Sequence, residues 1–196
     1  MTSHYIDLFV NRADTTRNPS TSSSKPSPPS IAGNLTASSL EAKELAGAAE
    51  DGCTFCEIVT GKQEAYKVYE DDLVIAFLDI LPIRPGHLLV VPKKHYERVS
   101  HLPDEFSASI GRTLPRISRA LCRAMDQPDF NIVSNQGYAQ VVPHVHYHLV
   151  PAPLPNAPPT SNAQRLFPRN ELDDEEGEKI SRRIREELAK EGRAKM

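Results

Sequence analysis

Hydrophobic and polar positions divide the chain into a polar beginning, a patterned middle and a charged end. From about residue 67, short apolar runs rich in Val, Ile, Leu and aromatic residues alternate with turn residues, which is the pattern of short β-strands. An acidic turn at Asp71 and Asp72 separates the first two runs and indicates a hairpin. The pattern predicts five strands, at residues 67–70, 73–79, 87–92, 130–135 and 144–151.

Two segments have helical spacing instead. Over residues 104–126 apolar side chains recur at steps of three and four, and Pro115 within this pattern predicts a kink. A second, highly charged helix is predicted from about Asn170 onward, and its charged face is typical of a helix that docks on the domain or on a partner subunit. Its apolar face would consist of Leu172, Ile180, Ile184 and Leu188.

The patterning also divides the chain into three parts. Proline and serine dominate the stretch before the first strand, so residues 1–48 are expected to be a mostly disordered tail, with a possible short helix at 39–49. Residues 50–155 are expected to form the globular domain. Residues 156–196 would comprise a proline-rich loop and the charged C-terminal helix.

Composition narrows the functional classes. A length of 196 residues suits one domain, and a net charge of -3 gives no electrostatic case for binding nucleic acid or a membrane surface. The longest apolar runs are much shorter than a membrane span, and the first residues contain no long apolar segment typical of a secretory signal. Three cysteines cannot form a disulfide framework. The expected location is the cytoplasm, the nucleus or both.

The segment "VPHVHYHLVP" (142–151) carries the strongest chemical signal, because three of the chain's 7 histidines occupy alternate positions in it. Side chains of a strand point to opposite faces in turn, so His144, His146 and His148 would share one face, with an apolar face behind them. A solvated polar face is the simplest explanation for one histidine, but a weak one for three in register. The alternatives are a shared metal ion and nucleophilic catalysis by a neutral imidazole.

A second signal is "CTFC", in which Cys53 and Cys56 have the spacing of zinc ligands. No second Cys-x-x-Cys is present, so a tetrahedral site would need two ligands from elsewhere, and His95 and His144 are candidates. Two thiolates and two imidazoles would form a closed structural site. The alternative is a pair of free or packing thiols. Cys122 falls within the helical pattern and is expected to belong to the core.

Taken together, "HVHYHLV" (144–150) and the upstream stretch from "CTFCEIV" to "VVPKKH" resemble the histidine-triad family. The resemblance covers about residues 53–155 and is greatest to the zinc-carrying branch of histidine-triad nucleotide-binding proteins. It implies an α+β fold, a five-stranded antiparallel sheet with helices that pairs into a homodimer. It also implies a hydrolase acting at the α-phosphate of purine nucleotides, typically adenosine phosphoramidates.

The resemblance further implies a role for each matching residue. His146 would be the nucleophile that forms a nucleotidyl-histidine intermediate, His148 would bind phosphate and handle a proton, and His87 would lie beside the nucleophile. Asp79 would hold the ribose hydroxyls, although an Asp after a strand can also simply cap a turn. The remaining implied residues are Ile80 near the base, Asn135 on the phosphate side, Gln140 in the adjoining loop as a further substrate-binding residue, and a zinc set of Cys53, Cys56, His95 and His144.

Three other functions remain open from the sequence. The first is hydrolysis of dinucleoside polyphosphates. The second is a zinc-stabilised nucleotide-binding or scaffold module with little catalysis. It is favoured by Val141, which stands three residues before His144 where the nucleotide-binding branch often has a hydroxyl side chain. The third is a catalytic zinc held by His144, His146 and His148.

Overall fold

The computed structural model describes residues 50–153 and 170–193. The predicted disordered tail, the possible helix at 39–49 and the proline-rich loop therefore lie outside the described residues. Within the described ranges, no helix combines the length and the apolar character needed to cross a membrane.

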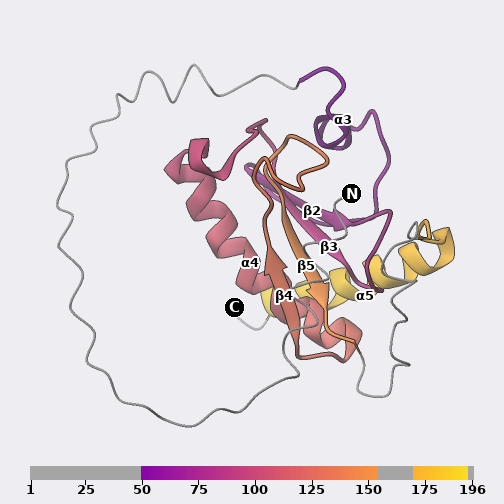
Figure 1. Cartoon of the computed structure of the whole chain (residues 1–196). Coiled ribbons are helices and arrows are strands. Elements are labelled where there is room, and N and C mark those ends of the chain that lie inside the picture. Colours follow the sequence, from indigo (N-terminus) through magenta and orange to yellow (C-terminus); the bar gives the residue numbers. More distant parts are fainter. Residues whose placement is uncertain (1–49, 154–169, 194–196) are drawn as a thin grey trace, which may run out of the picture.

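The predicted antiparallel sheet of five strands is confirmed (Figure 1). Its strand order is β1-β2-β3-β5-β4, and all four pairings are antiparallel. The strands are β1 (Lys67–Glu70), β2 (Val74–Leu78), β3 (Leu88–Pro92), β4 (Phe130–Val133) and β5 (Tyr147–Pro151). The helices are α3 (Thr54–Thr60), the 3-10 turn η1 (Val99–His101), α4 (Asp104–Met125) and α5 (Asp174–Arg193).

Helices cover the two faces of the sheet in different ways. Alternate residues of β2 and β3 divide between two apolar clusters, as strand geometry requires. Ala76 and Val90 belong to the cluster that contains α4 and α5, whereas Phe77 and Leu89 belong to the cluster that contains α3. The side chains of α3 thus lie on the opposite face of the sheet from those of α4 and α5. The helix that covers the face with the alternating histidines is therefore the short helix α3.

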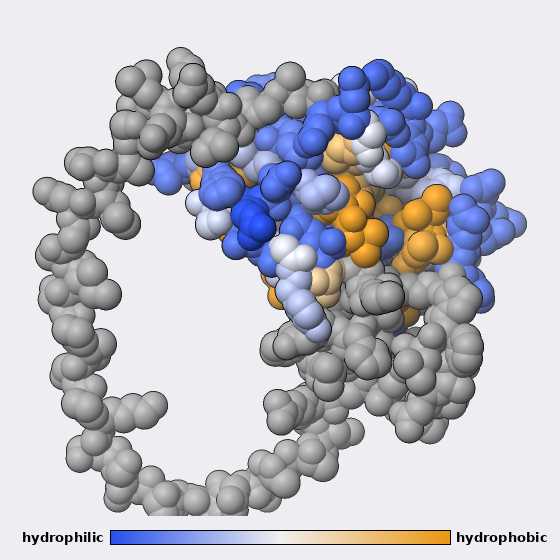
Figure 2. Space-filling model, turned by 45° about the horizontal axis from the view of Figure 1, so that its top comes forward, coloured by the Kyte–Doolittle hydropathy of each residue, from blue (hydrophilic) through white to orange (hydrophobic). Residues whose placement is uncertain are grey.

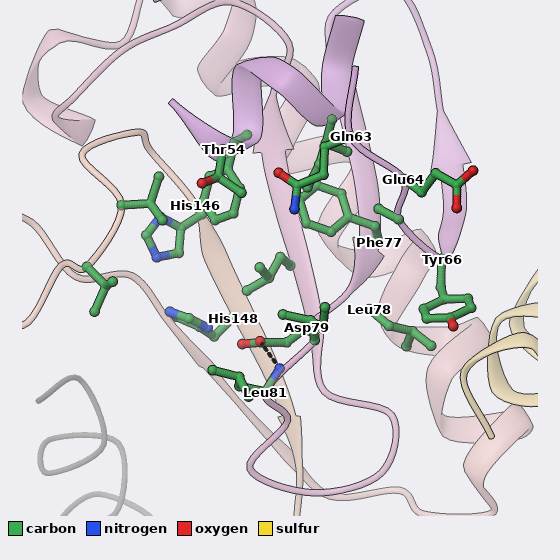
Figure 3. Close-up of a pocket in the computed structure, with 17 residues that line it drawn as sticks. Thr54, Gln63, Glu64, Tyr66, Phe77, Leu78, Asp79, Leu81, His146 and His148 are labelled. Atoms are coloured by element: carbon green, nitrogen blue, oxygen red, sulfur yellow. Dashed lines mark hydrogen bonds between the residues drawn. The ribbon is translucent and has the colours of Figure 1, made fainter. Parts of the chain in front are cut away.

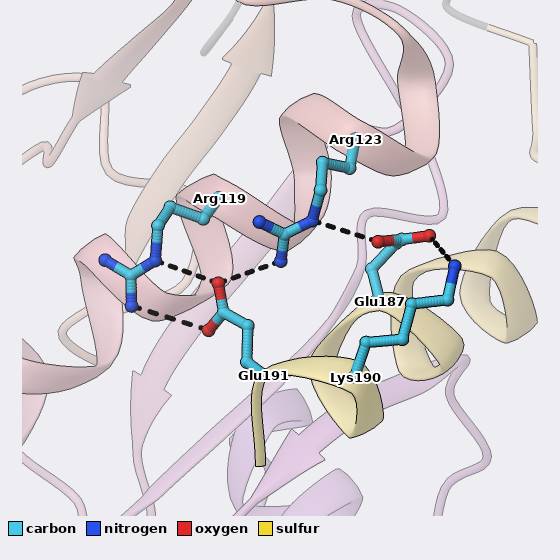
Figure 4. A network of polar contacts seen from close by, with 5 residues as sticks. All are labelled: Arg119, Arg123, Glu187, Lys190 and Glu191. Atoms are coloured by element: carbon cyan, nitrogen blue, oxygen red, sulfur yellow. Dashed lines mark hydrogen bonds and ion pairs between the residues drawn. The ribbon is translucent and has the colours of Figure 1, made fainter. Parts of the chain in front are cut away.

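Helix α5 completes the larger core rather than standing apart from it. The four residues predicted for its apolar face are all buried in the cluster that contains α4, although α5 begins at Asp174 and Leu172 lies just before it. At its polar edge, Arg119 and Arg123 of α4 pair with Glu187 and Glu191 of α5, at nitrogen-to-oxygen distances of 2.8 to 2.9 Å (Figure 4). The expectation that this helix docks on the domain is therefore confirmed.

The last strand is shorter than predicted. It was expected over residues 144–151 but begins at Tyr147, because the backbone N–H of His144 bonds to the carbonyl of Val142 and that of Val145 bonds to Tyr96. The predicted alternation nevertheless holds through this bend. Val145 and Leu149 are buried in apolar clusters, so the reverse side of the histidine segment belongs to the core.

Large apolar side chains are exposed at only a few of the described positions, and Figure 2 shows orange apolar surface surrounded by hydrophilic surface. Three of them, Ile80, Leu81 and Val141, line one pocket. Exposed apolar groups around a concave site are typical of a ligand-binding site. This pocket contains the histidines described next.

Candidate functional site

A cavity of about 250 Å³ lies against the sheet face that carries α3. Figure 3 shows His146 and His148 at one end, Asp79 in between, and Tyr66 at the other end. The walls between these polar groups are mostly apolar and include Phe55, Ile58, Phe77, Leu78 and Leu89. The site therefore combines a group of imidazoles with a slot suited to a flat, apolar ring.

His146 is buried, and its hydrogen bonding fixes the protonation of its ring. Its Nδ1–H donates to the carbonyl oxygen of His144 over 2.6 Å, and a carbonyl can only accept. In the neutral ring the lone pair therefore belongs to Nε2. Burial lowers the pKa of His146, which favours this neutral form. The Phe55 ring packs edge-on against it at 5.2 Å and restricts the imidazole to this orientation.

His148 and His87 form a second unit beside His146. The His146 and His148 ring centres are 4.7 Å apart, and Nε2 of His87 lies 2.9 Å from Nδ1 of His148. The backbone nitrogen of Ile83 lies 3.2 Å from Nδ1 of His87. If Nδ1 of His87 accepts from Ile83, Nε2 of His87 donates to His148 and the His148 proton lies on Nε2; if Nδ1 donates instead to Oδ2 of Asp79, 3.3 Å away, Nδ1–H of His148 donates to His87. In the first arrangement, or as an imidazolium in the second, His148 can donate from Nε2 to an anionic group in the pocket.

Asp79 lines the pocket and has two contacts nearby. Its Oδ1 accepts the backbone N–H of Leu81 over 2.9 Å, which is the turn-capping role considered from the sequence. Its Oδ2 lies 3.3 Å from Nδ1 of His87. Ile80 follows it, also lines the pocket and is 53% exposed. The roles expected of these two residues, toward the ribose and the base, stay predictions.

The structure does not place Asn135 and Gln140 on the cavity wall. The Gln140 carboxamide holds the loop instead, accepting from the N–H of Gly137 over 2.8 Å and donating to the carbonyls of Glu97 and His144 at 2.9 and 3.3 Å. Its donor thus reaches the same carbonyl that orients His146. Asn135 is buried, and its amide nitrogen makes no hydrogen bond to the described residues. Their substrate-binding roles stay predictions.

The predicted zinc set comes together as one buried cluster. Ligand atoms of Cys53, Cys56, His95 and His144 all lie within 4.8 Å of one another. Cys53 Sγ to His144 Nδ1 and Cys56 Sγ to His95 Nδ1 are both 3.4 Å, close to the roughly 3.5 Å expected between sulfur and nitrogen around a tetrahedral zinc ion. Two sulfurs and two nitrogens are a preferred donor set for zinc, so the residues fit the ion.

Hydrogen bonds and burial around the cluster also suit a metal. The Nε2–H of His144 donates to the carbonyl of Pro92 over 2.9 Å, which leaves the Nδ1 lone pair directed at the thiols. Burial raises the pKa of Cys56 to about 11 and lowers that of His144 to about 4. Burial alone thus favours the neutral thiol of Cys56, whereas a bound divalent cation would stabilise the cysteines as thiolates.

Sequence reasoning missed two kinds of residue in this region. Glu50, just before the first cysteine, has its Oε2 2.6 Å from Nε2 of His95, the arrangement by which carboxylates orient metal-binding imidazoles. No motif marks that residue. The pocket walls formed by Phe55, Phe77 and Tyr66 were also missed, although the large apolar side chain of Phe55 between the two cysteines could have drawn notice.

Comparison with known proteins gives consistent matches. The HIT domain family model matches residues 60–153. A protein of Schizosaccharomyces pombe named adenosine 5'-monophosphoramidase is 40% identical over 103 residues, which covers 52% of this chain and 74% of that one. A protein of Arabidopsis thaliana named adenylylsulfatase is 35% identical over 116 residues, which covers 58% of this chain but only 59% of that longer one.

A solved structure adds a three-dimensional comparison. The crystal structure of a zinc-bound histidine-triad protein from Mycobacterium smegmatis superposes with a TM-score of 0.60 at 34% identity, covering 73% of this chain and 97% of that one. That protein binds zinc, and the likeness in fold agrees with the sheet and helices described above.

Proposed function

Because this chain belongs to the histidine-triad family, we propose that it hydrolyses purine nucleotide conjugates at the α-phosphate, in the manner of an adenosine 5'-monophosphoramidase. The observation that carries the proposal is the state of His146. Its Nδ1–H is bonded to the backbone, its lone pair is on Nε2, and the side chain lines a pocket with mostly apolar walls. A neutral imidazole can attack an anionic phosphoryl group without charge repulsion.

The reaction would proceed in two displacements. Nε2 of His146 forms a bond to the α-phosphorus as the bond from phosphorus to the amine nitrogen breaks. The departing amine takes a proton from Nε2–H of His148, whose ring would enter this step as an imidazolium and leave it neutral. Water then attacks phosphorus and breaks the bond to Nε2, and its proton returns to His148. The products are a nucleoside monophosphate and the free amine.

The geometry supports one orientation of the substrate. With phosphate between His146 and His148, Asp79 in the pocket wall would accept hydrogen bonds from ribose hydroxyls. The base would then occupy the apolar slot beyond, bounded by Ile58, Phe77 and Ile80. Stacking and burial of the base supply affinity there, while the imidazoles fix the position of the reacting phosphorus.

We assign the zinc ion a structural role. Cys53, Cys56, His95 and His144 would fill all of its tetrahedral positions, so the bound ion would supply folding stability and no reaction chemistry. The cluster also fixes His144, whose carbonyl orients the His146 ring. This argues against a catalytic zinc held by the three alternating histidines, because Nδ1 of His144 faces the thiols and Nδ1 of His146 is hydrogen-bonded to the backbone.

Two other leaving groups deserve direct comparison. One relative is named adenylylsulfatase, and adenylyl sulfate also places a good leaving group on an α-phosphate. Dinucleoside polyphosphates are the other alternative. Turnover of an adenosine phosphoramidate, adenylyl sulfate and diadenosine triphosphate by the same preparation would rank them. Absence of turnover of all three, with adenosine monophosphate still bound, would favour the nucleotide-binding module.

The mechanism has its own experiment. The protein is mixed with an adenosine phosphoramidate, quenched within one turnover, and its intact mass is measured. The proposal expects a gain equal to one adenylyl group that disappears when His146 is replaced. A phosphoramidase that never shows the adduct, even when turnover is slowed, would refute the covalent route.

We further propose that the protein acts as a homodimer. β4 lies at the edge of the sheet, and Ile132 on it has 46% of its side chain exposed. An open edge with exposed apolar groups is suited to pairing with a second copy. Sedimentation velocity over a range of protein concentrations tests this, and a monomer at micromolar concentration would contradict it.

A further inference from the structure

The base-binding end of the pocket shares a wall with a second cavity. This second cavity, of about 600 Å³, lies against the start of α5 and is lined by Glu171, Leu172, Asp174 and Arg185 among others. Five residues line both cavities: Gln63, Glu64, Ala65, Tyr66 and Ile80. This shared wall separates the slot from the space beside α5, and Tyr66 and Ile80 are the members of it that hydrogen-bond to residues 172–174.

Tyr66 is held in this wall from the side of α5. Its hydroxyl donates to Oδ1 of Asp174 over 2.5 Å, and Figure 3 shows the ring at the opposite end of the pocket from His146, near the ribbon of α5. The ring also lies directly over Gly177. A Cβ atom at that position would come within 2.7 Å of two ring carbons, so only glycine allows the ring this place. The hydrogen bond to Asp174 raises the pKa of Tyr66 to about 12, which keeps the hydroxyl a donor at neutral pH.

Ile80 is tied to the same part of the chain. The backbone N–H of Leu172 donates to the carbonyl of Ile80 over 2.8 Å, and Leu172 is itself buried in the main core. Both wall residues thus contact the segment Leu172–Gly177, which lies more than ninety positions further along the sequence. A stable C-terminal helix can in this way fix the end of a slot formed by the sheet and α3.

We propose that Tyr66, positioned by the first turn of α5 through Asp174 and Gly177, sets the length of the base-binding slot and so limits which purine bases fit. The inference rests on the proposed function, since it assumes that a nucleotide base occupies the apolar end. The exocyclic N6 edge of adenine is the edge farthest from the ribose, so it would face Tyr66. Shortening this side chain would join the two cavities and admit a base enlarged at N6.

The test measures binding rather than turnover, with adenosine monophosphate and N6-benzyladenosine monophosphate as probes. Calorimetry on the full chain is expected to show that the wild type binds the unmodified nucleotide better. In Tyr66→Ala the ratio of the two affinities should shift by roughly tenfold toward the benzyl compound, the order of effect of added bulk in an apolar pocket. Should Tyr66→Ala fail to fold, Tyr66→Leu retains apolar packing against the core while shortening the side chain.

A double-mutant cycle tests whether α5 acts through Tyr66. Gly177→Ala is expected to weaken binding of adenosine monophosphate several-fold when Tyr66 is present, to have little effect in the Tyr66→Ala background, where the clash is gone, and to have a reduced effect in Tyr66→Leu, which lacks the two nearest ring carbons. Arg119→Ala is the matched control, because it loosens α5 from α4 away from the pocket and should leave the affinity ratio unchanged.

The possible failures are distinguishable. A wild type that binds neither nucleotide contradicts the proposed function itself. A wild type that binds adenosine monophosphate, with Tyr66 variants that keep the same affinity ratio, contradicts only the role of Tyr66. Equal effects of Gly177→Ala in both backgrounds would show that α5 does not act through this ring.

Discussion

Nδ1 of His146 donates a 2.6 Å hydrogen bond to the carbonyl oxygen of His144. His144 in turn directs its own Nδ1 to the sulfur of Cys53 at 3.4 Å. His144 therefore takes part in two sites. Its side chain belongs to the cysteine–histidine cluster, and its carbonyl oxygen accepts the hydrogen bond that orients the proposed nucleophile. Substitutions can separate the two contributions, because the cluster should govern stability and the His146 ring should govern turnover.

Replacing His146 with Asn should remove turnover and retain nucleotide binding. The Asn amide can still donate to the His144 carbonyl, but it supplies no Nε2 lone pair. We expect kcat to fall by about 10³-fold or more, as for other nucleophiles, while affinity for adenosine monophosphate changes only a few-fold. His101→Asn is the control, since His101 is exposed in η1 and should keep full activity. Retention of more than a tenth of wild-type kcat by His146→Asn would argue against the assigned nucleophile.

Loss of zinc should lower stability before it affects catalysis. We expect Cys53→Ser to reduce the metal content to below one ion per chain and to lower Tm by roughly 8–16 °C, if the ion contributes about 4 kcal/mol. Activity per folded molecule should change little at a temperature well below the transition. Metal analysis and thermal melts check this, with Cys122→Ser as a control because Cys122 lies outside the cluster. Immediate and complete loss of activity on chelation, in a protein that remains folded, would instead indicate a catalytic ion.

The glycine before His87 should tolerate no side chain. Gly86 has φ of +84°, and a Cβ there would lie 3.0 Å from the side chain of Met125. Gly61 has a similar φ of +75° but open space around it. Both Ala variants should lose about 1–2 kcal/mol from backbone strain, and Gly86→Ala should lose about 1 kcal/mol more from crowding. Urea unfolding of the two variants measures the difference. Equal losses would show that Met125 moves aside freely.

The contact between α4 and α5 should weaken in acid. Hydrogen bonds from Arg119 and Arg123 lower the pKa of Glu191 to about 2, below the ordinary 4.5. The unfolded chain therefore binds more protons between these values, so the stabilisation is complete above about pH 4.5 and is lost as the pH falls toward 2. Arg119→Ala/Arg123→Ala should lower Tm by roughly 2–5 °C at pH 7, and the difference from wild type should shrink toward pH 3. A difference independent of pH would mean that packing, not charge, accounts for it.

Much of the sheet and of the site could be predicted because the signals are local. Strand alternation correctly assigned Val145 and Leu149 to the core, and Cys-x-x-Cys spacing with two candidate histidines identified residues that meet in one cluster. The start of the last strand was predicted too early. Alternation alone cannot reveal that His144 leaves the sheet to face Cys53, since that depends on a contact 91 positions away.

Other features depend on long-range contacts that no local pattern records. Gln140 was expected to bind substrate from the loop, and its hydrogen bonds to the loop backbone, including the carbonyls of Glu97 and His144, could not be read from the sequence. The link from Tyr66 to Asp174 joins residues 108 positions apart. The apolar face of the C-terminal helix was predicted from its spacing, but its contact with one end of the pocket could only be found in three dimensions.

The burial of Leu172, Ile180, Ile184 and Leu188 against α4 bears on how the protein can be shortened. A fragment that ends at Pro153, where the family match stops, would keep every histidine. It would, however, expose to water the apolar side chains of α4 and β1 that these residues cover. Such a fragment would aggregate during expression, and the loss of soluble protein could be mistaken for a lack of enzymatic activity. The shortest fragment suited to expression and assay therefore extends through α5.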